Sequence, residues 1–445
     1  MRQTATLGAA LVVALGSWTA PAHAASALSA IAPELARGLG QVPSNALVVV
    51  APFVSDMVAA HGEELAARLA TLMAGQLGPT AHANARTLPF SVARALAAKG
   101  GALVYIQAEV ASGHVRATAD LYPVLSNGWD RIRVPLPAPR AHAFASAPID
   151  AEIRSFFPPL GLERVEVHKA RHELGDVLAV SCGELDGGGG NELVVVTRGA
   201  VARGRIVAGK FVASHAAPWS ALAPRAPVPL REPLATSAIV PRVDGTGADL
   251  FVGTTDRGGV ALSRDLRGAA PVRGLPVLAG GTAVCARPDP AASAFEGSLL
   301  ACVGEGQANG SGGKAVVLPS PRYDAVVVDE VVRRDGTFVR LVATRDPDGR
   351  LRLRAGDQDE KIALELVGSQ LAIGDLDEDG EAEVVTTSES GDDGITIWSW
   401  RGHDLVRRLR IPAPLAVRAL AVCPAGDAGR RPLVAVVGEE VWVVR

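Results

Sequence analysis

The sequence predicts a mainly β protein in which a small α/β domain precedes a ring of repeated sheets. Three observations predict this class. Apolar runs of helical and strand spacing alternate before residue 134, and short β-rich segments separated by turns fill the chain after Gly161. One strand–loop–strand pattern also returns at intervals of about forty to sixty residues, which indicates an architecture built from repeated sheets.

The first 24 residues have the pattern of a secretory signal peptide. Arg2 supplies a positive charge, Leu7 to Leu15 form a short apolar core, and Ala22-His23-Ala24 is a cleavage sequence. The chain is therefore expected to be exported, to the periplasm or the extracellular space. No later run reaches about 18 apolar residues, so no transmembrane segment is expected after cleavage.

Residues 26–134 are expected to form the α/β domain. Ala46–Phe53 reads as a buried strand, and Glu63–Leu77 carries apolar residues at helical spacing. Ala102–Val110 and His114–Val124 read as two strands of a hairpin. Residues 135–160 are rich in proline and alanine and are interpreted as a linker.

Residues 161–445 are expected to form a β-propeller, because the repeat spacing matches a four-stranded blade. The loop Asp375–Glu383 aligns without gaps with Glu184–Glu192, and further copies lie at Val243–Val252 and Pro424–Pro432. We count six units, and the long interval between Cys182 and Val243 leaves a seventh blade open. Arg164–His168 could supply the last outer strand and close the ring, which removes exposed sheet edges.

The best-preserved copy of the loop has the oxygen donors of a calcium site. Three aspartates alternate, Gly380 permits a sharp turn, and a carboxylate follows at position nine. An EF-hand is excluded, because its position twelve would be Thr386 and because strands flank the loop. The alternative interpretation of this motif is an acidic surface turn without metal. The candidate ligands are Asp375, Asp377, Asp379, Glu381 and Glu383.

Two resemblances follow from these motifs. The pattern D-x-D-x-D-G-x-x-E between strands resembles the FG-GAP/VCBS repeat of integrin-α-type propellers, which implies one Ca²⁺ held by the four side chains and the carbonyl of Glu381. That family usually has aspartate where Glu383 stands. Val48–Phe53 and Ala97–Val124 resemble the N-terminal α/β domain of TolB-like proteins, with Pro123 replacing the usual aspartate.

The four cysteines suggest two disulfides in an exported chain. Cys285 and Cys302 lie on successive strands of one unit, and we predict that they pair. Cys182 and Cys423 occupy nearly the same place in the first and last units, which are neighbours in a closed ring. We therefore predict a second bridge between them. Four buried free thiols are the alternative.

The sequence predicts a non-catalytic binding or scaffold protein, expected to be monomeric. It contains no G-x-S-x-G, H-E-x-x-H or phosphate-binding loop. Its net charge of −3 argues against nucleic-acid binding, which needs a concentrated basic face. The resemblances imply a protein partner in the envelope or outside the cell. The alternative is a secreted enzyme acting on polysaccharides or lipids, because FG-GAP/VCBS blades also occur in such enzymes.

Overall fold

The structure is a computed structural model that describes most of the chain from Ser26 onward. The predicted signal peptide lies outside the described residues, as do residues 243–246 of the shortened repeat copy, so these remain predictions. The described residues are 26–53, 61–98, 100–111, 114–124, 138–157, 161–163, 165–186, 190–227, 232–242, 247–289, 294–302, 316–333, 337–356, 361–388, 392–401, 404–424 and 431–445.

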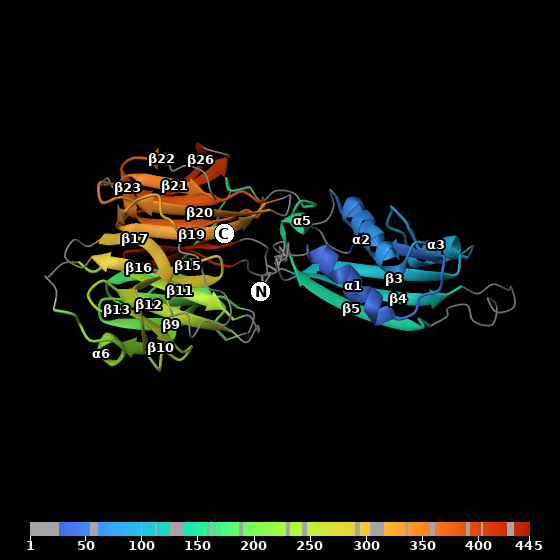
Figure 1. Cartoon of the computed structure of the whole chain (residues 1–445), viewed down its shortest axis with the longest axis horizontal. Helices are drawn as coiled ribbons and strands as arrows, with labels where there is room; N and C mark the ends of the chain where they lie inside the picture. Colours follow the sequence, from blue (N-terminus) through green and yellow to red (C-terminus); the bar gives the residue numbers. More distant parts are fainter. Residues whose placement is uncertain are drawn as a thin grey trace, which may run out of the picture.

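Residues 26–157 form an N-terminal unit in which helices pack on a five-stranded sheet (Figure 1). The strand order is β2-β1-β3-β4-β5; β1 is parallel to β2 and β3, and the other pairs are antiparallel. The elements are α1 (Ala27–Leu39), β1 (Ala46–Val50), α2 (Gly62–Leu77), β2 (His82–Ala83), α3 (Phe90–Ala97), β3 (Ala102–Ala111), β4 (His114–Pro123), β5 (Ala141–Pro148) and α5 (Ala151–Arg154).

The core of the N-terminal unit follows the sequence periodicities. In α2, Leu65, Leu69 and Met73 recur at helical spacing and are fully buried. In β4 the buried residues alternate, so one face of the strand contributes Val115 and Ala117 to the same cluster. Among the described residues, no helix combines the length and the apolar character needed to cross a membrane.

The interpretation of residues 135–160 as a linker is wrong for residues 141–148, which form β5 and pair with β4 over eight residues. The short helix expected between Ile149 and Phe157 is present as α5. The alternate alanines of β5 are buried under α1, where a Cβ on Gly38 would lie 2.6 Å from the Cβ of Ala143. Small residues therefore allow α1 to approach β5 closely. The alanine-rich composition that resembles a linker is explained by this packing of a helix on a sheet.

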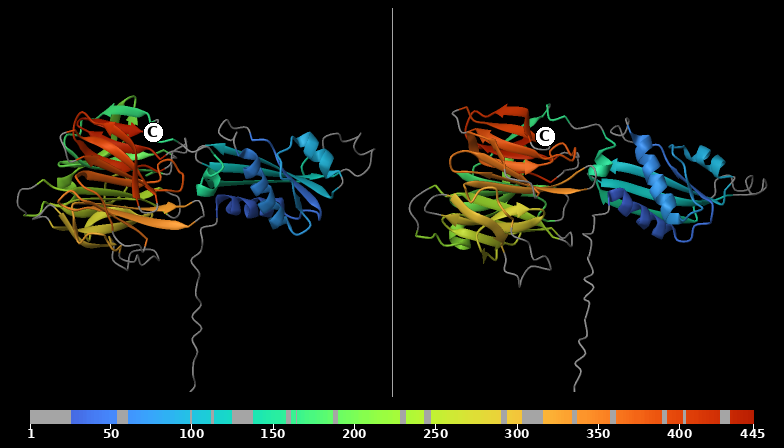
Figure 2. Two further views of the ribbon diagram at one scale, coloured as in Figure 1. Left: turned by 90° about the horizontal axis from the view of Figure 1, so that it is seen from above. Right: turned by 45° about the horizontal axis from the view of Figure 1, so that its top comes forward.

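The rest of the described chain folds into antiparallel groups of four strands arranged around a ring (Figures 1 and 2). The first and last groups are joined into one eight-stranded sheet by a single parallel residue pair, Lys210↔Arg171. The first strands of the sheets contact one another in the order β7, β11, β15, β19, β23 and β27, and β27 contacts β7. This arrangement is a β-propeller. The strands are β6 (Val167–Arg171), β7 (Val177–Gly183), β8 (Glu192–Thr197), β9 (Ala200–Val207), β10 (Lys210–Pro218), β11 (Ala235–Pro241), β12 (Ala248–Thr254), β13 (Gly258–Leu262), β14 (Ala270–Val272), β15 (Leu275–Ala279), β16 (Thr282–Asp289), β17 (Ala294–Ala301), β18 (Arg322–Tyr323), β19 (Ala325–Val332), β20 (Phe338–Arg345), β21 (Leu351–Ala355), β22 (Lys361–Leu364), β23 (Val367–Gly374), β24 (Glu383–Ser388), β25 (Gly394–Arg401), β26 (Asp404–Pro412), β27 (Val417–Val422), β28 (Leu433–Val437) and β29 (Glu440–Val444), with the short helix α6 (Trp219–Leu222) after β10.

The ring is closed by a strand from each end of the propeller sequence. Strand β6 pairs antiparallel with β29 from Glu440↔Arg171 to Val444↔Val167, and so completes the sheet β27-β28-β29-β6. An outer strand upstream of the first unit was predicted at Arg164–His168, and the observed strand lies three residues further on. Closure covers the edge of β29 with an antiparallel partner.

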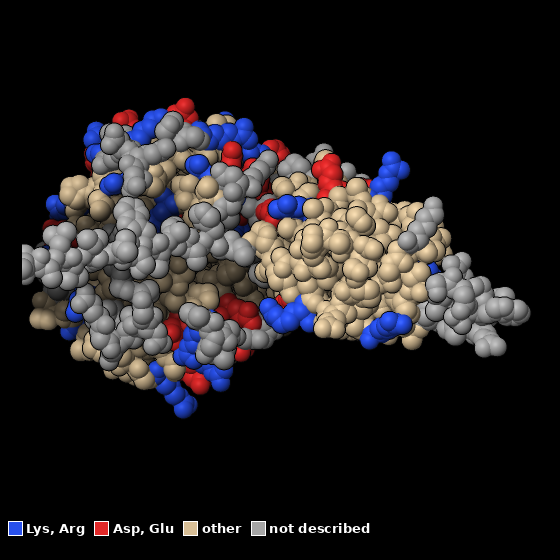
Figure 3. All heavy atoms as spheres, turned by 45° about the vertical axis from the view of Figure 1, so that its right-hand side comes forward, with Lys and Arg blue, Asp and Glu red and all other residues tan. Residues whose placement is uncertain are grey.

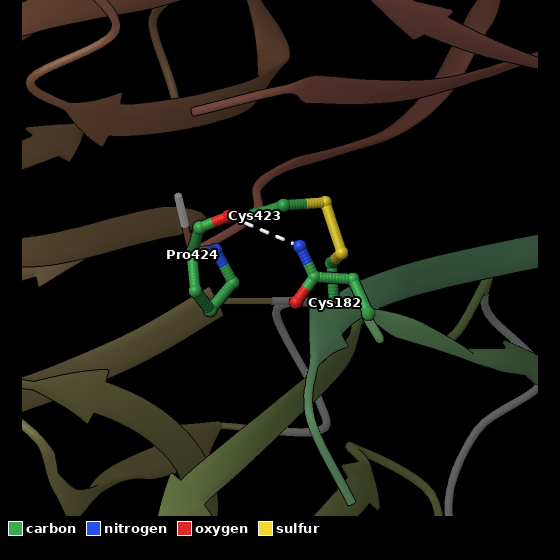
Figure 4. Close-up of a disulfide and its surroundings, with 4 residues drawn as sticks. Cys182, Cys423 and Pro424 are labelled. Carbon is green, nitrogen blue, oxygen red and sulfur yellow. Dashed lines mark hydrogen bonds between the residues drawn. A yellow bond between two sulfur atoms is a disulfide. The ribbon is translucent and has the colours of Figure 1, made fainter. Parts of the chain in front are cut away.

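Both predicted disulfides are present. Cys285 and Cys302 are joined within the sheet β15–β18, and Cys182 is joined to Cys423 (Figure 4). The second bridge links the end of β7 to the residue just after β27, so it connects the first and last sheets of the ring. Near the bridge, the side-chain amide of Asn191 donates a hydrogen bond to the carbonyl of Pro424 at 3.0 Å.

Replacing Cys182 and Cys423 by serine should destabilise the protein more than replacing Cys285 and Cys302. The bridges are separated by 241 and 17 residues in sequence. Loop-closure entropy then gives losses of about 5 and about 3 kcal/mol. Urea unfolding followed by tryptophan fluorescence compares the two double variants, and equal losses would contradict the chain-entropy explanation.

Candidate metal centre

The acidic loop is held between two paired strands. Gly374, the last residue of β23, pairs with Glu383, the first residue of β24. This register places Asp375 and Glu383 at the two ends of the loop, facing each other. A Cβ on Gly374 would lie 2.7 Å from Val422 of the neighbouring sheet. A glycine is therefore needed where the loop meets the last sheet of the ring.

Hydrogen bonds within the loop curl its backbone around Asp375. The two carboxylate oxygens of Asp375 accept from the backbone amides of Asp379 and Gly380, both at 3.0 Å. The Oδ1 atom of Asp379 accepts from the amide of Glu381 at 2.8 Å. Gly380 has φ 83° and Glu378 has φ 53°, so the turn uses left-handed backbone, where glycine is favoured.

Three carboxylates meet at the base of this loop. One oxygen each from Asp375, Asp377 and Glu383 lies within 4.8 Å of the others, and all three residues are buried. Glu383, 0% exposed, accepts from the amide of Leu376 at 2.8 Å and from the hydroxyl of Ser399 at 2.9 Å. Asp377 is 3% exposed, and its buried Oδ1 atom has no hydrogen-bond partner.

The other two predicted ligands are placed differently. Asp379 lies outside the three-carboxylate cluster, although its charge raises the pKa of Asp377. The side chain of Glu381 is exposed and lies 3.5 Å from Arg401, which agrees with a role for its backbone alone. The carbonyl of Glu381 and the side chain of Asp379 stay predictions as metal ligands.

Burial makes the charged forms of the cluster unfavourable. Burial raises the pKa of Asp375 to about 7, against the hydrogen bond from Gly380. Burial and then the charge of Asp379 raise the pKa of Asp377 to about 6. Burial and then the charge of Asp377 raise the pKa of Glu383 to about 9. Such carboxylates need a positive charge beside them to ionise together at neutral pH.

The described residues do not supply that charge directly. In the part of the chain that the structure describes, no lysine, arginine or histidine forms an ion pair with Asp375, Asp377 or Glu383 within 4.0 Å. Arg408 donates to Ser399 at 3.2 Å and to Glu163 at 2.9 Å, and Arg431 lies 3.3 Å from Asp329. Their charges reach the cluster only at longer range.

The first repeat shows the same loop with its charge compensated. Gly183 pairs with Glu192 as Gly374 pairs with Glu383, so the two loops share a register. Here Arg203 of β9 contacts the buried carboxylate of Glu192 at 2.6 Å and Asp186 at 3.5 Å. Arg205 lies 3.4 Å from Glu192. Where the first loop has an arginine, the loop at Asp375 has an uncompensated cluster.

These supporting residues were not predicted. Ser399 lies opposite Glu383 in the pairing of β24 with β25, and Arg408 lies on β26, the next strand. Neither is near the acidic motif in sequence. Only the strand register, which depends on tertiary pairing, brings them to Glu383.

A larger cavity of about 460 Å³ lies at the beginning of β7. His172 lines it, but its ring nitrogens contact the backbone of Gly438 at 3.1 Å and of Leu174 at 3.4 Å. The lining acids Asp176 and Glu232 are exposed and pair with Arg198. The histidine therefore has a structural explanation, and this cavity supplies no nucleophile–base pair among its described residues.

No protein-family model matches the chain, and no curated protein matches it. Solved structures do match. They include the WD40 repeats of RRP9, at 13% identity over 64% of this chain and 98% of that chain, with a TM-score of 0.38. AofleA from Arthrobotrys oligospora matches at 12% identity over 63% and 86%, with a TM-score of 0.37. TolB from Acinetobacter baumannii matches at 11% identity over 91% and 94%, with a TM-score of 0.32. These likenesses are limited to the general fold.

Replacing Arg203 by methionine should destabilise the first repeat strongly. The change keeps most of the side-chain volume but leaves the buried carboxylate of Glu192 without its closest cation. Removing one partner of a buried ion pair costs about 3–5 kcal/mol. Urea unfolding at neutral pH measures the loss. A loss below about 1 kcal/mol, typical of an exposed pair, would show that Arg203 is not the counter-charge.

Proposed function

We propose that the protein is an exported, non-catalytic binding scaffold whose propeller is stabilised by one Ca²⁺ in the loop Asp375–Glu383. The main support for a metal site is the cluster of three buried carboxylates, which have no cation paired to them among the described residues. One oxygen of Asp377 in this cluster also lacks a hydrogen-bond partner. The proposed ligands are Asp375, Asp377, Asp379, Glu383 and the carbonyl of Glu381, as in the FG-GAP/VCBS resemblance. The ion supplies positive charge when bound.

The donor chemistry favours calcium over other cations. All proposed ligands are oxygens, which suit a hard cation, whereas zinc prefers histidine or cysteine. The four cysteines are already in disulfides, a state typical of proteins outside the reducing cytosol. In an exported protein, calcium at millimolar levels can fill even a site with a dissociation constant of about 10⁻⁴ M.

The proposal includes the domain plan. A signal peptide of residues 1–24 is removed, a TolB-like α/β domain extends to Phe157 because β5 and α5 belong to it, and a six-bladed propeller follows from Gly161. We expect a monomer in the periplasm or outside the cell.

The scaffold role is supported by the chemistry of the described residues. The buried acids are explained by the metal and by ion pairs, and the cavity of about 460 Å³ at the beginning of β7 has no catalytic pair among its described residues. In the face shown in Figure 3, lysines and arginines are mixed with acids over the propeller, which does not favour nucleic acid. The expected partner is a protein of the envelope or the extracellular space, bound without chemical change.

The class of function is tested by comparing binding with turnover. The mature protein is immobilised and exposed to envelope extract, and captured proteins are identified and then bound in purified form. In parallel it is screened for hydrolysis or elimination on polysaccharides and for phospholipid cleavage. Saturable binding of one purified partner without turnover supports the scaffold. Turnover that purifies with the protein would instead support the secreted enzyme.

Asp377→Asn should have opposite effects with and without calcium. In EDTA at pH 7.5 the change removes an unpartnered buried charge, so the melting temperature should rise by about 2–5 °C. With calcium at about 100 times its dissociation constant, the wild type should gain about 2.7 kcal/mol and the variant should gain little. Thermal melting with calcium and with EDTA measures both effects.

The control for this experiment is Asp186→Asn in the first repeat, where Arg203 and Arg205 already contact the acid. This variant should keep the full calcium response. No calcium shift in the wild type, with no change in the Asp377 variant, would remove the metal from the proposal.

A further inference from the structure

Helix α5 lies at the end of the N-terminal unit that is nearest the propeller (Figures 1 and 2). It is anchored in the N-terminal unit, because Ile153 is fully buried in that core. Asp150, just before the helix, accepts hydrogen bonds from the amides of Ile153 at 2.9 Å and Ala27 at 2.6 Å. Phe157 therefore still packs in the N-terminal core, whereas Leu162 and Glu163, further along the chain, contact the propeller.

A chain of hydrogen bonds connects Glu163 to the metal cluster. Glu163 accepts from Arg408 at 2.9 Å, and Arg408 donates to Ser399 at 3.2 Å. Ser399 in turn donates to Glu383 at 2.9 Å. Each link is a side-chain contact, so two residues, Arg408 and Ser399, connect Glu163 to Glu383.

An apolar contact reaches the same loop. Leu162 is buried in the same cluster as Leu376, which lies in sequence between two of the proposed ligands. Leu162, Leu376 and Asp377 also line one cavity of about 20 Å³. A space of this size holds no more than one water molecule, so Leu162 packs closely against the metal loop.

We propose that metal binding in the loop Asp375–Glu383 and docking of Leu162 and Glu163 on the propeller are coupled, so that the metal centre controls how firmly the N-terminal unit is held. The inference rests on the proposed function. Both connections use residues within the metal loop or one hydrogen bond from it. If the loop loosens without its cation, the docking contacts of Leu376 and Ser399 loosen with it.

The expected coupling free energy depends on the exposed ion pair of Glu163 and on the buried apolar contact of Leu162. The side chain of Glu163 is 62% exposed, so its ion pair with Arg408 alone is weak. With the apolar contact of Leu162 added, the lower end of typical coupling, about fivefold, is expected. Coupling is reciprocal, so weakening the docking must weaken calcium affinity by the same factor.

Hydrogen exchange on the full mature chain tests the coupling. Peptides covering residues 151–163 should exchange about fivefold more slowly in calcium than in EDTA. Peptides from β3 and β4, inside the N-terminal core, should exchange at equal rates in both. Calcium affinity is measured in parallel by titration with the metal alone.

Two matched variants test whether the contact of Glu163 with Arg408, and not a general change in the protein, is responsible for the coupling. Glu163→Gln removes the negative charge that pairs with Arg408, so it weakens this contact and should lower both the exchange protection and the calcium affinity. Glu166→Gln changes a glutamate three residues further on that is 82% exposed and whose ion pair among the described residues is with His168 at 3.4 Å. This control should behave as the wild type.

The outcomes distinguish the two proposals. A calcium-induced rise in melting temperature with unchanged exchange at residues 151–163 would overturn the coupling and leave the metal centre standing. Equal behaviour of the Glu163 and Glu166 variants would also overturn it. Absence of any calcium shift in the wild type would remove the metal centre and the coupling together. Slower exchange that Glu163→Gln reduces and Glu166→Gln keeps supports the coupling.

Discussion

Closure of the ring is the constraint on which the rest of this structure depends. Each sheet of a propeller packs its faces on two neighbours, so an open ring would expose both a sheet face and the edge of β29. The pairing of β6 with β29 removes that edge, and the bridge between Cys182 and Cys423 ties this last sheet to the first. Closure therefore uses residues from both ends of the propeller sequence.

The loops between the first and second strands of the sheets show two solutions to one electrostatic problem. A register that pairs Gly374 with Glu383, or Gly183 with Glu192, buries a glutamate at the start of the second strand. A buried carboxylate needs a nearby cation. In the first sheet Arg203 provides it, and in the fifth we propose that a divalent metal does. On this proposal the repeats share a strand register and differ in the source of positive charge.

The metal loop also borders the connection to the N-terminal unit. Glu163 and Leu162 reach it from the described residues that follow the N-terminal unit. The proposed coupling extends the effect of metal occupancy from the propeller to the N-terminal unit.

The sequence by itself was sufficient to predict the β-rich repeat, the acidic motif and both cysteine pairings. Each of these follows from the local spacing of residues and from the alignment of the repeat copies. The sequence misled at residues 141–148, where alternate alanines look like a linker and become a strand only under α1. It also did not reveal Ser399, Arg408 or the role of Arg203. Those residues acquire their positions from strand register and from packing between sheets. Such long-range pairing is a property of the tertiary structure, since residues far apart in the chain must first be brought together before their charges can compensate one another.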